Sequence, residues 1–130
     1  MQQLKTGIKG RLEETVTYEV SAVGIKSGGL PVYGTPMMVG LMERTAWSSV
    51  EPYMEEGMGT VGTYLDIKHV SASPIGANIV CESNLVEVDG RRLVFEVKAY
   101  DEAGLIGEGK HERFIIQNDK FMARTEAKLK

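Results

Sequence analysis

The alternation of apolar and polar residues predicts a chain made mainly of β-strands. Residues 14–20 alternate and are rich in β-branched side chains, which predicts a first strand. Further strand-like runs follow Gly57, at residues 60–73, 78–88, 92–101 and 105–117. Turn-forming residues separate these runs, and Asp89-Gly90 between two alternating segments is the strongest hairpin signal in the sequence. The second half of the chain is therefore predicted to be four long strands joined by tight turns.

A loop and one helix are predicted between the first strand and these four. Residues 21–34 are rich in glycine and contain Pro31, which is typical of a long loop, and loops of this length are commonly functional. Thr35 is suited to the N-cap of a helix and Pro36 to its first helical position. Apolar residues then recur at helical spacing as far as Val50, and Pro52 marks the end. The helix is apolar around much of its circumference, which predicts deep burial.

This order of elements predicts an α+β domain, in which an antiparallel sheet packs one face against the helix. We expect residues 1–130 to form a single domain, with 119–130 as a solvated C-terminal tail. One helix cannot cover a broad sheet of long strands. Association of two copies is therefore expected to protect the remaining surface.

Composition narrows the classes of function. The 15 basic and 18 acidic residues give a net charge of −3, which argues against a nucleic-acid partner. Cys81 is the single cysteine, so an internal disulfide is impossible and a reducing compartment is expected. No segment has the apolar run of a signal peptide or a membrane span, so we expect a cytoplasmic protein without a membrane partner. The two histidines lack His-Glu-x-x-His spacing, and no metal site is expected.

Four polar residues are candidates for chemistry. Glu43 lies within the apolar helix, where a carboxylate is costly unless it is paired, although it could also lie at the helix edge and reach solvent. His69 lies in a predicted strand, on an apolar face where a histidine is often only structural, and His111 is expected to be exposed or at a rim. Thr35 could serve only as a cap. Together, however, Thr35, Glu43 and His69 supply the hydroxyl, carboxylate and base that hydrolysis of an activated acyl group requires.

Several motifs carry a resemblance to a known family. The first is Gly34-Thr35-Pro36 continuing to Glu43, the second is Gly62-Thr63 followed by His69, and the third is Ser73-Pro74-x-Gly76. Similarity continues through residues 89–93, 109–113 and 120–121, so it covers the chain from about Thr15 to Phe121. With these motifs the sequence resembles the hotdog-fold thioesterases, in particular the fluoroacetyl-CoA thioesterase-like family.

The resemblance implies a fold, a site and a reaction. The fold is a five-stranded antiparallel sheet wrapped around one long central helix, assembled as a homodimer or a dimer of dimers with active sites near the interface. The catalytic residues fall on Thr35, Glu43 and His69, and substrate contacts fall on Gly62 and Arg113. The reaction implied is hydrolysis of a short or medium acyl-CoA to a carboxylate and free coenzyme A. No cofactor is expected, since coenzyme A is part of the substrate.

Two divisions of labour are compatible with these residues. In one, Thr35 is the nucleophile, His69 is its general base and Glu43 orients the imidazole. In the other, Glu43 attacks or activates water while Thr35 and the helix N-terminus hold the carbonyl oxygen. About 12 Å of helical rise separates Thr35 from Glu43, so contact between them would need a later helix start or a partner subunit.

The same fold also serves two other functions, namely non-catalytic binding of acyl-CoA and dehydration or hydration of enoyl thioesters. A sensor usually carries an attached regulatory domain, and a dehydratase usually has its histidine on the helix, so both comparisons favour hydrolysis. The fluoroacetate-specific members carry phenylalanines ahead of the threonine as a lid over the acyl group. Residues 26–33 contain no phenylalanine, which predicts weak preference among short and medium acyl groups.

Overall fold

The computed structural model describes residues 4–130 of the chain. Its strands are β1 (Lys9–Thr15), β2 (Met58–His69), β3 (Asn78–Asp89), β4 (Arg92–Asp101) and β5 (Gly104–Gln117). Its helices are α1 (Thr35–Val50) and α2 (Asn118–Glu126), with short 3-10 turns at Tyr18–Val20, Glu51–Tyr53 and Ala127–Leu129.

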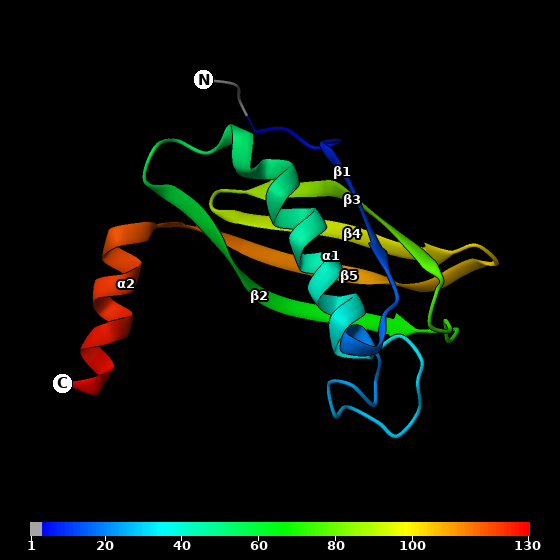
Figure 1. The fold of residues 1–130 in the computed structure, drawn as a ribbon. Coiled ribbons are helices and arrows are strands. Elements are labelled where there is room, and N and C mark those ends of the chain that lie inside the picture. The colour runs from blue at the N-terminus through cyan, green and yellow to red at the C-terminus, as the bar shows by residue number, and fades with distance from the viewer. Residues whose placement is uncertain (1–3) are drawn as a thin grey trace.

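The strands form one antiparallel sheet in the order β1-β3-β4-β5-β2, and α1 lies across one face of it (Figure 1). The α+β architecture predicted from the sequence is confirmed. Asp89 pairs with Arg92 at the predicted hairpin, so the loop has two residues, and Gly90 takes a positive φ of 62° at its first position. β1 and β2 are the two edges, and β2 is a long strand paired only with β5.

The core lies between α1 and the sheet. The buried face of α1 contributes Met38, Leu41, Met42, Ala46 and Val50, and the sheet contributes residues that include Ile79, Leu85, Phe95 and Ile106. Cys81 is buried in this core, as expected of a small apolar residue. Gly107 allows α1 to pack closely against β5, because a Cβ at this position would lie 2.6 Å from Met38 Cε.

Three elements differ from the sequence prediction, and in one of them, β2, the strand ends at His69 and not at residue 73. The first strand is Lys9–Thr15 and not residues 14–20, because the chain turns at Tyr18–Val20, where the N–H of Val20 donates to Thr17 O over 3.2 Å. Val16, just after the strand, is buried, and its N–H donates to Ala77 O over 2.9 Å. At the start of α1 the N-cap is Gly34, which has extended φ and ψ, and Thr35 is already inside the helix. The prediction that Thr35 caps the helix is therefore wrong by one residue.

The C-terminal segment forms a helix that projects from the end of β5 (Figure 1). Every residue from Asn118 to Lys130 is exposed, and most of the segment predicted as a tail is helical. Neither α1 nor α2 is long and apolar enough to cross a bilayer.

Candidate active site

A hydroxyl and an imidazole meet where α1 begins and β2 ends. Thr35 Oγ1 lies 2.7 Å from His69 Nδ1, so the hydroxyl donates to the ring when Nδ1 is unprotonated. Burial lowers the pKa of His69, which keeps the imidazole neutral and able to accept a proton at neutral pH. The pair opens into a hollow of about 290 Å³, which Val32 and Ala72 also line. A hydroxyl and a neutral imidazole are thus in hydrogen-bond contact beside an open hollow, an arrangement suited to a nucleophile and its base.

Thr35 is held in place by the residue pair that precedes it. Tyr33 is buried, its Oη donates to Glu14 over 2.5 Å, and its N–H donates to Ser73 O over 2.8 Å. The Gly34 N–H donates to Val20 O over 2.9 Å. Burial raises the pKa of the Tyr33 phenol, and the hydrogen bond to Glu14 raises it further, so the phenol remains a donor. Sequence reasoning missed Tyr33, for which the signal was an aromatic residue at the end of a glycine-rich loop.

A second group lies near the middle of α1. Arg113 Nη1 is 3.7 Å from Glu43 Oε2, and the two side chains are 8% and 38% exposed. Gly62 faces both: a Cβ at this position would lie 2.8 Å from Glu43 Oε2 and 3.3 Å from Arg113 Nη1. Gly62 therefore leaves the carboxylate accessible where a side chain would cover it. The structure therefore brings Glu43, Gly62 and Arg113 together. An acidic residue is tolerated in this apolar helix because its carboxylate is paired with Arg113 and partly solvated.

His111 is buried, and the expectation that it is exposed is wrong. Its Nδ1 lies 2.9 Å from Tyr64 O, and because a carbonyl only accepts, Nδ1 carries the proton. His111 Nε2 then accepts from Arg113 Nη1 over 3.2 Å. Burial is the main cause that lowers the pKa of His111, and the Arg113 charge adds to it. His111 is thus a neutral acceptor that directs the guanidinium.

The other edge of the Arg113 guanidinium is bound to β2. Arg113 Nε donates to Thr60 Oγ1 over 2.8 Å, and Nη2 donates to Thr60 O over 3.0 Å. Because Nη1 donates to His111, all three nitrogens of the guanidinium have a hydrogen-bond partner. Nη1 also faces the Glu43 carboxylate. Thr60 was not found from the sequence, and His111 was named there but placed in the wrong environment.

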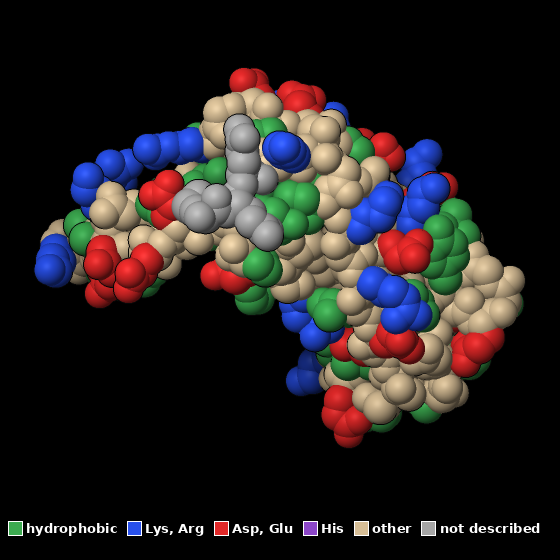
Figure 2. All heavy atoms as spheres, turned by 90° about the horizontal axis from the view of Figure 1, so that it is seen from above, with side chains coloured by type: hydrophobic (Ala, Val, Ile, Leu, Met, Phe, Trp, Pro, Cys, Tyr) green, Lys and Arg blue, Asp and Glu red, His purple; other side chains and the backbone are tan. Residues whose placement is uncertain are grey.

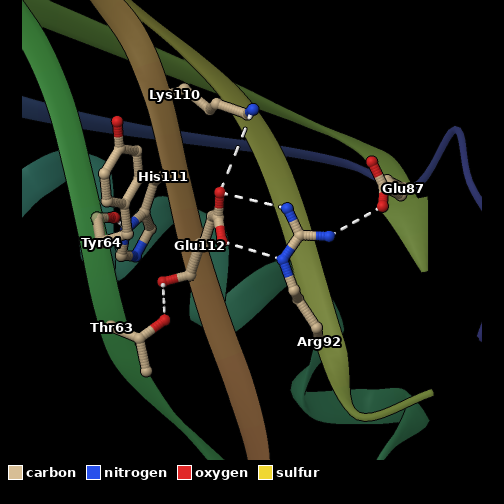
Figure 3. A network of polar contacts seen from close by, with 7 residues as sticks. All are labelled: Thr63, Tyr64, Glu87, Arg92, Lys110, His111 and Glu112. Carbon is tan, nitrogen blue, oxygen red and sulfur yellow. Dashed lines mark hydrogen bonds and ion pairs between the residues drawn. The ribbon is translucent and has the colours of Figure 1, made fainter. Parts of the chain in front are cut away.

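The opposite face of β5 carries a polar network that fixes the strand between its neighbours (Figure 3). Arg92 Nε donates to Glu112 Oε1 over 2.9 Å, and Arg92 Nη1 donates to Glu87 over 2.8 Å. Thr63 lies at the bulge in β2 and donates its hydroxyl to Glu112 O over 3.2 Å. Hydrogen bonding to Arg92 lowers the pKa of Glu112, so the network stays charged. The strand that carries His111 and Arg113 is therefore tied to both adjacent strands.

The two groups do not meet within one copy of the chain. No hydrogen bond or ion pair within residues 4–130 joins Glu43 or Arg113 to Thr35 or His69. Along α1, Thr35 and Glu43 are about 12 Å apart in rise. Along β2, Gly62 and His69 are about 23 Å apart at the usual strand spacing. Glu43 therefore does not contact the His69 imidazole within one copy of the chain, as the hypothesis that it orients this ring would require.

Protonation of His111 should cost stability. The pKa of His111 in the folded protein is below its ordinary value of 6.5, so between the two values the unfolded chain binds more protons and stability falls as pH falls. Arg113, Glu43 and Glu112 are the charged groups near the ring, and only the first disfavours the imidazolium. We expect His111→Gln to remove up to about 1.4 kcal/mol per pH unit from the pH dependence of the unfolding free energy below this value.

Denaturant unfolding at several pH values measures this slope. Because the chain has two histidines, NMR titration of the wild-type protein, with His69→Gln for assignment, reports the His111 pKa even if His111→Gln fails to fold. A His111 that titrates at or above 6.5 would contradict the buried, neutral assignment.

Within residues 4–130 no cluster of three His, Cys, Asp or Glu side chains could hold a metal ion. The chemistry of the site is that of a hydroxyl, an imidazole, a carboxylate and a guanidinium. One long helix packed on a five-stranded antiparallel sheet is the architecture of the hotdog fold. The family model for fluoroacetyl-CoA-specific thioesterases matches residues 13–119, and the chain belongs to this family.

Individual relatives agree with this assignment. The chain is 40% identical over 97 residues to the fluoroacetyl-CoA thioesterase of Streptantibioticus cattleyicolor, a match covering 75% of this chain and 70% of the relative. A crystal structure of a fluoroacetyl-CoA thioesterase superposes with a TM-score of 0.91 at 32% identity and 98% coverage of both chains. A Thermus thermophilus thioesterase superfamily member gives 0.89 at 29% identity, with coverage of 98% and 94%. The resemblance noted from the motifs is confirmed.

Proposed function

We propose that this protein hydrolyses short or medium acyl-CoA thioesters to a carboxylate and free coenzyme A. The observation that carries the proposal is the 2.7 Å contact between Thr35 Oγ1 and His69 Nδ1 at the helix start. Membership of a thioesterase family supports it. So does the similarity to a fluoroacetyl-CoA thioesterase variant whose crystal structure contains acetyl-CoA, at a TM-score of 0.91 and 30% identity.

The proposed chemistry has two steps. Thr35 Oγ attacks the thioester carbonyl, His69 takes the hydroxyl proton and passes it to the departing sulfur, and the C–S bond breaks to leave an acyl-threonine ester. Water then attacks this ester and gives a proton to the Glu43 carboxylate, the bond to Thr35 breaks, and Glu43 returns that proton to the departing Thr35 oxygen. These steps use side chains alone, so the proposal includes no cofactor besides the coenzyme A of the substrate.

A one-step alternative uses the same residues, with Glu43 activating water directly while Thr35 holds the carbonyl oxygen. Mass spectrometry of protein quenched during turnover distinguishes the two routes. Only the first route forms an ester on Thr35.

For Glu43 to act at Thr35, we propose that two protomers share each site. β2 is an edge strand, and its Tyr64 and Leu65 side chains are exposed. Such an edge is suited to pairing with a second copy. A two-fold axis between Leu65 and Asp66 would pair β2 with its counterpart and set His69 beside the partner's Gly62. The Thr35–His69 pair of one protomer would then face the Glu43 and Arg113 of the other, which supports a homodimer.

The buried thiol supports a cytoplasmic location as part of the proposal. Burial raises the pKa of Cys81 to about 11, so the thiol stays protonated and unreactive. A chain without a disulfide is suited to a reducing compartment.

Release of free thiol from a panel of acyl-CoAs tests the activity and its selectivity. Gly28 and Gly29 lie in an exposed loop whose Ser27 lines the hollow beside Thr35, and no aromatic side chain from residues 26–31 covers it. We expect weak preference among short and medium acyl groups. After division by the hydroxide rates, fluoroacetyl-CoA should exceed acetyl-CoA by less than roughly 200-fold, the limit of an apolar pocket.

Two outcomes contradict these expectations in different ways. A larger corrected ratio would show that specificity is built outside the loop. No thiol release from any acyl-CoA, with binding retained, would favour the non-catalytic acyl-CoA-binding function.

A further inference from the structure

A basic groove lies between α2 and the end of the sheet. It has a volume of about 460 Å³, and we call it the C-terminal groove. Its cations come from the β3–β4 turn and from the C-terminal segment, and its aromatic residues come from β5 and α2. These residues are Arg91, Lys120, Arg124, Lys128, Phe114 and Phe121.

The charge in this groove is unbalanced. No acidic residue lines it, and none of its four cations forms an ion pair with residues 4–130. Asp119 and Glu126 of α2 lie outside the lining. Figure 2 shows Lys and Arg side chains gathered along one side of the projecting C-terminal end. A cluster of four uncompensated cations in a chain of net charge −3 favours a polyanionic ligand.

Another hollow shows that this imbalance is not general. A hollow on the sheet, which Val97 also lines, contains three lysines, but it contains three carboxylates from the same strands as well. Those residues are Lys68, Lys98, Lys110, Asp66, Glu96 and Glu108. Mixed charge of this kind is ordinary solvated surface, whereas the C-terminal groove presents a single sign.

Aromatic side chains accompany the cations. Phe114 and Phe121 are both exposed and both line the groove. Exposed aromatic faces stack on planar bases, and lysine and arginine bind phosphate oxygens. The groove therefore combines donors for several phosphates with a stacking surface for a base.

We propose that the C-terminal groove binds the 3′-phosphoadenosine diphosphate part of coenzyme A. This inference rests on the proposed function, because the substrate class supplies a polyanion that carries an adenine. Ile115 and Gln117 line the groove and lie on the same face of β5 as Arg113, whereas Phe114 lies on the opposite face, so the groove opens around the end of the strand. The distance from Gln117 to Arg113 along this face is about 13 Å, which an extended pantetheine arm can span, so a thioester at the Glu43–Arg113 group is compatible with a nucleotide in the groove.

Charge reversal in the groove tests this assignment. Lys120→Glu with Arg124→Glu changes two exposed residues of α2, and Lys5→Glu with Lys9→Glu makes the same change of net charge near the N-terminus. By calorimetry on the full chain, we expect the α2 variant to raise the Kd for coenzyme A about tenfold, and less at high salt, because exposed charge pairs are weak individually and screened. 3′-Dephospho-CoA should bind the wild type more weakly than coenzyme A and lose less in the variant.

Kinetics on two substrates complete the test. The α2 variant should raise KM for acetyl-CoA with kcat unchanged, and it should leave kcat/KM for acetyl-pantetheine unchanged, since that substrate lacks the nucleotide. If circular dichroism shows that the α2 variant has lost helix, Arg91→Glu takes its place in the test, because Arg91 lies outside α2. We expect this variant to change KM in the same direction.

Equal weakening of both substrates, an unchanged Kd for coenzyme A, or the same loss in the N-terminal control would overturn the proposal. If acetyl-CoA is hydrolysed but the groove variants change nothing, the groove assignment fails alone. If the groove variants weaken coenzyme A binding but no acyl-CoA is hydrolysed, the proposed function fails and the groove assignment stands.

Discussion

Glu43→Gln is expected to lower kcat for acyl-CoA hydrolysis at least about 100-fold, the usual contribution of a general base. The amide keeps the size of the side chain and can still accept a hydrogen bond from Arg113, but it cannot take a proton from water. Because Arg113 is also bound to Thr60 and His111, its orientation should persist in the variant. Thiol release at saturating acetyl-CoA measures the change.

A matched carboxylate serves as the control. Glu56 is exposed and forms no ion pair with the described residues, so Glu56→Gln should keep wild-type turnover. Denaturant unfolding should show that the Glu43→Gln variant is folded. Wild-type turnover in that variant would mean that Glu43 serves only as the ion-pair partner of Arg113.

Most of the fold could be predicted from the sequence because buried positions recur with the period of the element. In the four strands after Gly57 and in the helix that ends at Val50, apolar residues recur at the spacing that a buried face requires. β1 was predicted at the wrong residues because it lacks such a pattern. It is an edge strand whose residues are exposed or only half buried, and Leu12 is its one large apolar side chain. Its position is therefore decided by pairing with β3 and not by a hydrophobic pattern of its own.

The candidate site shows the same limit. Resemblance supplied Thr35, Glu43, His69, Gly62 and Arg113, and the structure shows which of them are in contact. His111 was assigned to the wrong environment, although alternation correctly places it on the same face as Arg113. The positions that precede His111 on this face are Gly107 and Gly109, which carry no side chain, so no apolar pattern marks the face as inward.

The separation of the site into two groups could be predicted only in part from sequence. Spacing along the helix separates Thr35 from Glu43, and spacing along the predicted strand separates Gly62 from His69. The register that sets Gly62 opposite Arg113 is a property of the folded sheet. The free edge of β2 then connects the two observations, because the same strand that separates the groups in one protomer can unite them across a two-fold axis.

Mixing two inactive variants is expected to restore activity. Thr35→Ala removes the nucleophile from one half of each site, and Glu43→Gln removes the base from the other half. In a mixed dimer, one site combines both damaged residues and the other combines both intact ones. Random exchange makes half of the dimers mixed, so the preparation should recover roughly a quarter of wild-type activity, while each variant alone stays near its own low value.

Recovery of this size requires that Thr35 and Glu43 come from different protomers. If the site lay within one protomer, every site in the mixture would carry one damaged residue and no activity would return. Exchange is ensured by unfolding and refolding the mixed variants, and a tag on one variant isolates the mixed dimers for assay. Sedimentation at micromolar concentration should show a dimer or a multiple of it, because the exposed β2 edge of a free protomer favours pairing. A monomer there, or inactive mixed dimers of confirmed composition, would refute the shared site and return Glu43 to a role within its own protomer.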